Sequence, residues 1–159
     1  MKDSSRELDR IDRRILSALQ RNARLANQEL ADQLGLSPSA CWRRVRQLES
    51  DAIILRYAAV LDPVRIGLPV SVFTNVSLDK QGEKTLQVFE NAIADWPEVM
   101  ECYLMTGDAD YLMRVVVPDL TAYEQFLMRK LTRVPGIASI RSSFALRAVR
   151  HRTELPIGA

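Results

Sequence analysis

The chain has 159 residues, enough for one domain or two small ones, and its 47% hydrophobic content is that of an ordinary globular protein. The net charge is only +2, but residues 1–65 hold 12 basic and 9 acidic residues. Only this part therefore has an excess of positive charge, as expected of a segment that binds nucleic acid. The sequence contains no apolar run long enough to span a membrane, no secretion signal at its polar start, and no metal-ligand cluster among its two cysteines and one histidine. We therefore expect a cytoplasmic protein with no membrane partner, no metal and no other cofactor.

Three short helices are predicted within the first 50 residues. Residues 8–20 carry apolar side chains at helical spacing, and residues 28–34 repeat this pattern over two turns. Gly35 then suits a left-handed helix end, Ser37 suits an N-cap, and Pro38 suits the first position of a new helix. Two short helices joined by such a tight turn predict a helix-turn-helix.

The helix that begins at Pro38 has an apolar face and a basic face. Arginine can read guanine bidentately, serine can bond to either kind of base, and a helix N-terminus attracts phosphate. The residues predicted to contact double-stranded DNA are Ser37, Ser39, Trp42, Arg43, Arg44 and Arg46, with Arg44 expected on phosphate. Two alternatives stay open: the pair could be an ordinary solvated helical hairpin, and Trp42 could pack on the first helix instead of stacking on the DNA backbone.

β-Branched residues between Ile53 and Val60 predict a strand or short hairpin, which would form a wing beside the third helix. Residues 1–62 are thus predicted to be a winged helix-turn-helix domain. Two prolines and a glycine in residues 63–69 predict a linker, because they interrupt any regular element.

The rest of the chain predicts a βαββαβ order. Strands are expected at 70–78, 99–105, 111–117 and 137–146, with helices at 83–94 and 118–134. This order is that of a ferredoxin-like domain, placed at residues 70–150, so the chain is assigned to the α+β class. The two helices can cover one face of the sheet, and the apolar residues on the other face predict contact with a second copy. Residues 151–159 are expected to be a tail without assigned structure.

The turn at residues 106–110, TGDAD, is a candidate ligand site. Gly107 lets backbone N–H groups approach a carboxylate closely, and Asp108 or Asp110 can accept from an ammonium group. Glycine and aspartate are also ordinary turn residues, so a plain β-turn explains them without a ligand.

Several motifs in a fixed order resemble the Lrp/AsnC, or feast/famine, family of transcription regulators. They are LDRIDRRIL at 8–16, GLSPSACWRRVRQLE at 35–49, ILRYAAVLDP at 54–63, TGDADYLMRV at 106–115 and VPGIASIRSSFAL at 134–146. The resemblance implies dimers formed through the sheets, assembly into tetramers or octamers, and an amino acid that binds between dimers and changes the assembly or its DNA contacts.

Residues carried over from this family as effector contacts are Thr106, Gly107, Asp108, Asp110, Thr132 and Ser142. Within the family the stretches PEVMECYLMTGD and IRSSFAL are similar to regulators of branched-chain keto acid dehydrogenase operons, and DYLMRV is similar to regulators of cysteine detoxification. A branched-chain amino acid or cysteine is therefore the favoured effector. Ile140 and Arg147 depart from the leucine-responsive pattern, which has a threonine and an acid there, so the effector stays open.

Two other classes of function fit the sequence less well than a regulator. An enzyme would have to use His151 or the pair Asp108 and Asp110, and no nucleophile–base arrangement accompanies them, so no catalysis is expected. An amino-acid-binding assembly module without specific DNA binding is the main alternative, because ferredoxin-like domains also occur without a DNA partner. The arginines at 43–46 favour the regulator.

Overall fold

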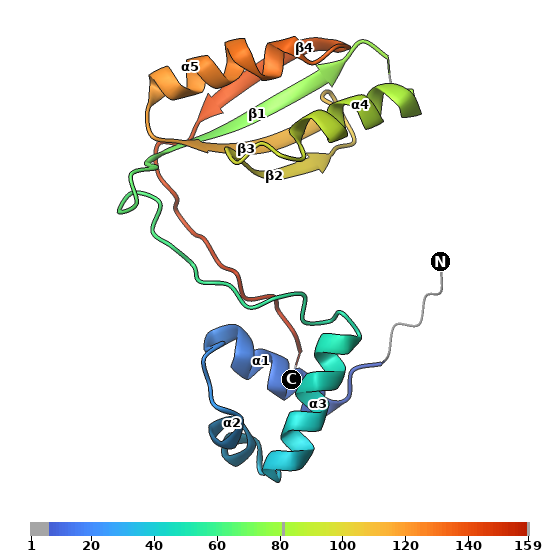
Figure 1. The fold of residues 1–159 in the computed structure, drawn as a ribbon, viewed down its shortest axis with the longest axis vertical. Helices are drawn as coiled ribbons and strands as arrows, with labels where there is room; N and C mark the ends of the chain where they lie inside the picture. Colours follow the sequence, from blue (N-terminus) through green and yellow to red (C-terminus); the bar gives the residue numbers. More distant parts are fainter. Residues whose placement is uncertain (1–6, 81, 159) are drawn as a thin grey trace. The chain divides into compact units, whose positions relative to one another are not determined.

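The computed structural model describes residues 7–80 and 82–158, so the first six residues of the polar N-terminal stretch lie outside it, as do residues 81 and 159. The chain forms two compact units. One contains the chain up to Val60 together with the chain from Arg150 onward, and the other contains Leu61–Val149 (Figure 1). Among the described helices, none is long and apolar enough to cross a membrane.

The first unit contains the three predicted helices, α1 (Arg10–Arg21), α2 (Asn27–Leu34) and α3 (Pro38–Ser50). Their ends follow the expected local chemistry: Gly35 ends α2 in the left-handed conformation with φ 68°, and the Ser37 hydroxyl accepts from the Ala40 N–H to begin α3. The inward faces share a core that includes Ile15, Leu16, Leu30, Ala31, Cys41 and Leu48. The helix-turn-helix prediction is confirmed.

The predicted wing is wrong. None of residues 53–60, all of which the structure describes, belongs to a strand. The N–H groups of Ile53 and Ile54 both donate to the Leu48 carbonyl, which turns these half-buried side chains back onto the helices. Residues 55–60 have no regular secondary structure and pair with no strand in the described part of the chain, and Leu55 and Val60 are 84% and 68% exposed. Ile53 and Ile54 therefore pack on the helical core, and Val60 lies in an extended connection instead of a hairpin.

The C-terminal tail, to which the sequence assigned no structure, packs on this first unit. The Gln20 side chain donates to the Leu155 carbonyl at 3.2 Å and accepts from the Leu155 N–H at 2.6 Å. Ile157 packs against the helical core two residues later. The chain therefore passes between its two units twice, once after Val60 and once before Arg150.

The second unit is an antiparallel sheet with two helices. Its elements are β1 (Val70–Leu78), α4 (Glu83–Ile93), β2 (Val99–Leu104), β3 (Tyr111–Val117), α5 (Leu120–Arg129), the 3-10 turn η1 (Leu131–Arg133) and β4 (Ile137–Phe144). The strand order is β2-β3-β1-β4, which confirms the ferredoxin-like prediction. The helix predicted to reach Val134 ends at Arg129 and continues as η1, and the last strand ends at Phe144 instead of Leu146.

Both helices cover the same face of this sheet (Figure 1). Val72, Val76 and Met113 on that face pack against Phe89 of α4 and Phe126 of α5. Strand alternation puts the neighbouring residues on the other face, which neither α4 nor α5 covers. That open face is mixed rather than wholly apolar: it carries the side chains of Phe73, Tyr103 and Leu112 and an ion pair between Arg114 and Glu101 at 3.1 Å.

Candidate functional site

The outward face of α3 presents the predicted polar residues to solvent. Ser39, Trp42 and Arg43 are all exposed, and Trp42 is 57% exposed, so it does not pack on the first helix. Within residues 7–80 and 82–158, no carboxylate forms an ion pair with Arg43. Ser37 is already engaged as the N-cap, and its hydroxyl lies 3.3 Å from that of Ser39. Arg43 therefore offers a complete guanidinium to a partner.

Arg44, expected on phosphate, instead points into the helical unit. Its Nη1 donates to Asp12 Oδ1 at 2.9 Å and to Asp9 Oδ2 at 2.6 Å, and Asp12 is fully buried. Asp9 is the N-cap of α1 and accepts from the Asp12 N–H, so these contacts join α3 to the start of α1. The backbone hydrogen bond from Asp12, followed by the one from Arg44, lowers the pKa of Asp9. The geometry gives Arg44 a structural role.

Arg46 is exposed but engaged within the unit. Its Nη1 donates to Glu49 Oε2 at 2.9 Å, and its guanidinium lies over the Trp42 ring, 6.0 Å from the ring centre. The other oxygen of Glu49 accepts from the Tyr57 hydroxyl at 3.0 Å. Burial and the bond to Glu49 raise the pKa of Tyr57 to about 12, so its hydroxyl remains a donor at neutral pH.

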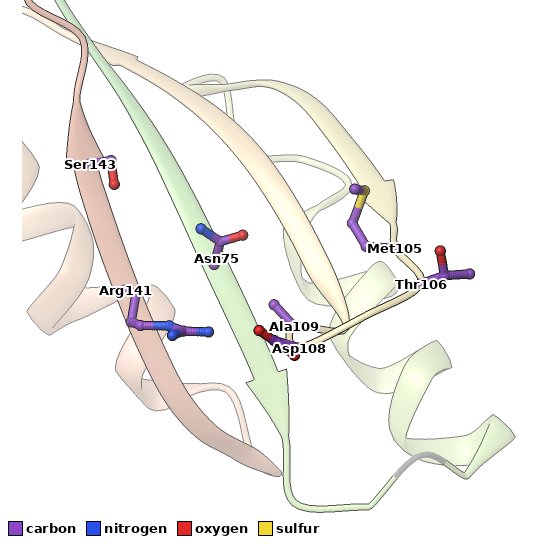
Figure 2. Close-up of a pocket in the computed structure, with 7 residues that line it drawn as sticks. All are labelled: Asn75, Met105, Thr106, Asp108, Ala109, Arg141 and Ser143. Atoms are coloured by element: carbon purple, nitrogen blue, oxygen red, sulfur yellow. The ribbon is translucent and has the colours of Figure 1, made fainter.

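A pocket of about 410 Å³ opens on the helix-free face of the sheet, beside the turn that follows β2 (Figure 2). This volume lies within the roughly 300–1,000 Å³ that small-molecule sites occupy. Its lining residues come from β1, β4 and the turn, and they are Asn75, Met105, Thr106, Asp108, Ala109, Arg141 and Ser143.

The pocket combines one cation, one anion and apolar surface. Figure 2 shows the Arg141 side chain reaching from β4 over β1, toward the side on which Asp108 and Ala109 lie. In the described part of the chain, neither Arg141 nor Asp108 forms an ion pair through its side chain. A guanidinium can hold a carboxylate and a carboxylate can accept from an ammonium group. Met105 and Ala109 supply an apolar surface between polar groups, so the lining complements a zwitterion with an apolar side chain.

The predicted turn residues divide between two roles. Thr106 and Asp108 line the pocket, and Gly107 lies between them with φ 126°, a conformation that side chains rarely adopt. Asp110 is only 8% exposed and its Oδ2 accepts from the Leu78 N–H at 2.7 Å, so it ties the turn to the end of β1. The carboxylate that faces the pocket is Asp108, and Asp110 holds the turn in place.

Thr132 and Ser142 do not line this pocket. The Thr132 hydroxyl donates to the Met128 carbonyl at the end of α5. Ser142 lies on the helix-covered face, where its hydroxyl is 2.6 Å from that of Tyr123, which in turn is 2.8 Å from the buried Thr74 hydroxyl. Their role as effector contacts, taken from the family resemblance, stays a prediction.

Sequence reasoning missed Asn75, Arg141 and Ser143. Arg141 and Ser143 flank Ser142 on the same strand, and adjacent strand residues point to opposite faces. Arg141 pairs with Asn75 across the β1–β4 ladder, which puts both on the open face next to the turn. The alternation of β4 could have indicated them, had its register with β1 been known.

No group of histidine, cysteine, aspartate and glutamate among the described residues could hold a metal ion. Cys41 is completely buried, as expected, and this burial raises the pKa of its thiol. Cys102 is half-buried, and burial raises its pKa to about 11. Both thiols thus remain protonated and weakly reactive at neutral pH.

Two domain families match the chain, one over the three helices and one over the sheet unit and part of the C-terminal tail. Residues 8–49 match the AsnC-type helix-turn-helix domain, and residues 71–155 match the Lrp/AsnC ligand binding domain. Both matches agree with the division between the basic helical face and the pocket.

Similar proteins cover nearly the whole chain. The Bkd operon transcriptional regulator of Pseudomonas aeruginosa is 50% identical over 95% of this chain and 99% of its own. The leucine-responsive regulatory protein of Escherichia coli is 37% identical over 98% of this chain and 95% of its own. Among solved structures, a transcriptional regulator of Neisseria meningitidis in complex with L-Met has a TM-score of 0.89 at 38% identity, covering 94% of this chain and 97% of that one.

Proposed function

The chain belongs to the Lrp/AsnC family of transcription regulators, and on this premise we propose that α3 reads operator DNA while an amino acid in the open-face pocket controls that binding. The observation that carries the proposal is the composition of the pocket. Arg141 and Asp108 offer opposite charges beside the apolar surface of Met105, which is the complement of an apolar amino acid.

We assign the DNA contacts to Ser39, Trp42, Arg43 and Arg46, with Ser37 and the N-terminus of α3 near a phosphate. The exposure of this face, and the lack of an ion pair between Arg43 and any described carboxylate, support the assignment. The alternative, an assembly module without specific DNA binding, does not explain why α3 exposes a basic face.

The favoured effector is a branched-chain amino acid, with cysteine and methionine as the next candidates. The apolar surface of Met105 and Ala109 suits an apolar side chain, the 50% identity to a Bkd operon regulator favours a branched-chain amino acid, and the L-Met complex of the Neisseria relative supports methionine as a candidate. Cysteine is a candidate through the family resemblance alone. Arg141 would hold the carboxylate and Asp108 the ammonium group, and the polar side chains of Thr106 and Asn75 also line the pocket. Thr132 and Ser142 belong to the proposal only through the family resemblance.

We also propose that the protein acts as a dimer or larger assembly in the cytoplasm, where its DNA lies. The open face of the sheet supports contact between copies, because Phe73 there is 39% exposed and Tyr103 is 54% exposed without a covering helix. A second copy on this face would also enclose the pocket, which strengthens charge pairing with a ligand.

Calorimetric titration of the full-length protein with leucine, isoleucine, valine, methionine and cysteine tests the pocket. Arg141→Ala should weaken binding about 10- to 100-fold, the equivalent of one lost charged hydrogen bond. Arg129→Ala removes an exposed arginine from α5 without touching the pocket, and it should bind like wild type. Equal affinities for wild type and Arg141→Ala would remove the pocket from the proposal.

A further inference from the structure

Glu49 is the acidic residue that bonds to the basic face of α3. It lies near the C-terminal end of the helix and is more sheltered than its partner: the Glu49 side chain is 27% exposed and that of Arg46 is 65% exposed. One carboxylate oxygen accepts from Arg46 Nη1 at 2.9 Å, and the other accepts from the Tyr57 hydroxyl at 3.0 Å. Tyr57 reaches Glu49 from outside α3, from the extended segment that leaves the helix.

This arrangement fixes the guanidinium of Arg46 without exhausting it. Arginine has five N–H donors, and the bond to Glu49 uses one of them. The Trp42 ring, 6.0 Å away, limits the same guanidinium from a second direction. An arginine already held in one orientation loses less rotamer freedom when it binds, and it can direct its remaining donors at one base edge.

We propose that Glu49 and Tyr57 are positioning residues of the DNA-binding site, which hold Arg46 in the orientation that reads a base pair. The inference rests on the proposed function of α3 and deepens it by naming residues that do not touch DNA themselves. It also gives the extended segment a role: Tyr57, outside the helix-turn-helix, contributes to the specificity of α3.

Simple electrostatics predicts the opposite result for Glu49, which makes the inference testable. A carboxylate on a DNA-facing helix repels phosphate, so its removal should tighten binding to every duplex if charge were its only effect. A positioning residue behaves differently, because its removal weakens binding to the correct sequence and leaves binding to random sequence unchanged or tighter.

The test uses full-length protein and a duplex that the wild type has selected from a randomised pool. Arg46→Ala should lower affinity for this duplex by about 5- to 150-fold and relax discrimination at one base pair. Glu49→Gln should lower the affinity about fivefold and relax discrimination at the same base pair, as part of the Arg46 effect. Tyr57→Phe, which loses only the hydroxyl, should act in the same direction by a smaller factor, about threefold, because Tyr57 contacts Glu49 and acts on Arg46 only through it.

Coupling between the variants is the decisive readout. Glu49→Gln and Tyr57→Phe should have no further effect in the Arg46→Ala background, because their effect acts through Arg46. Asp51→Asn is the matched control: it removes a carboxylate from the end of the same helix, where Asp51 accepts from Gln47, and should leave the discrimination profile unchanged. Thermal unfolding of each variant checks that the helical unit remains folded.

Three results would overturn the inference. The first is that Glu49→Gln binds both the selected and the random duplexes more tightly. The second is that Glu49→Gln still lowers affinity for the selected duplex in the Arg46→Ala background. The third is that Tyr57→Phe leaves the discrimination between base pairs unchanged. A wild-type protein that selects no duplex would instead refute the proposed DNA-binding function, and the inference with it.

Discussion

Arg44 and Arg43 are adjacent arginines on α3, and the structure predicts that replacing Arg44 lowers the stability of the helical unit whereas replacing Arg43 weakens DNA binding. Arg44→Met keeps most of the aliphatic stem but removes the guanidinium that bonds to Asp12 at 2.9 Å. Asp12 is fully buried, so it loses a charged hydrogen bond that water does not replace easily. Such a bond contributes about 1.5–3 kcal/mol, which we take as the expected loss of unfolding free energy in the helical unit. For a unit of this size the loss corresponds to a fall in Tm of roughly 6–24 °C.

Hydrogen exchange read segment by segment measures this change in the full-length protein. Amides of α1 and α3 should exchange about 10- to 150-fold faster in Arg44→Met, while those of β1 and β3 in the other unit keep their protection. Arg43→Met is the matched control, since an exposed side chain without an ion pair should change stability by less than about 0.5 kcal/mol. It should instead weaken DNA binding. The reasoning is refuted if Arg44→Met keeps wild-type protection and loses DNA affinity, because Arg44 would then be a phosphate contact.

Three further predictions follow from single features. Because the pKa of Asp9 is lowered, its carboxylate stabilises the folded unit at pH values above its ordinary pKa of 3.8, and this contribution is lost as the pH falls through the lowered pKa. In thermal unfolding, wild type should therefore have a higher Tm than Asp9→Asn at about pH 6, and this difference should vanish in acid. A difference in Tm that does not depend on pH would contradict the charge argument. Deletion of residues 153–159 removes Ile157 and the two Leu155 hydrogen bonds. It should lower the unfolding free energy of the helical unit by about 1 kcal/mol, or roughly 4–8 °C in Tm. Amide hydrogen exchange in the strands of the other unit should not change. Gly107→Ala places a side chain at φ 126°, which costs about 1–3 kcal/mol of backbone strain. In calorimetry the variant should bind the amino acid roughly tenfold more weakly, while its DNA binding in the absence of the amino acid stays the same. Unchanged affinity for the amino acid would show that the turn relaxes freely.

The elements with strong local signals were predictable from the sequence. The bounds of β1 and β3 agree residue for residue, because β1 alternates apolar and polar residues and β3 is a short apolar, β-branched run bounded by a turn and a proline. The start of α3 was equally clear, since Ser37 and Pro38 are the residues that a helix N-terminus prefers.

Predictions that depended on a distant partner were less successful. The wing failed because β-branched residues near Ile53 indicate burial as well as strands, and among the described residues of the helical unit none belongs to a strand. Arg44 was expected on DNA because the sequence does not show that Asp12, 32 residues earlier, lies against it. Arg141 was missed for a related reason: its place beside Asn75 depends on the register between β4 and β1, which the sequence alone does not fix.

The central claim is that one amino acid changes the binding of this protein to its DNA. The most direct measurement is a fluorescence anisotropy titration of the full-length protein against the DNA upstream of its own gene, over a range of salt concentrations, with and without each amino acid of the panel. We predict tight binding that falls steeply with salt and that an aliphatic amino acid shifts, with the shift lost in Arg141→Ala. Binding that no amino acid alters would contradict the role of the pocket, and affinity no greater than that for random DNA at every salt concentration would contradict the regulator itself.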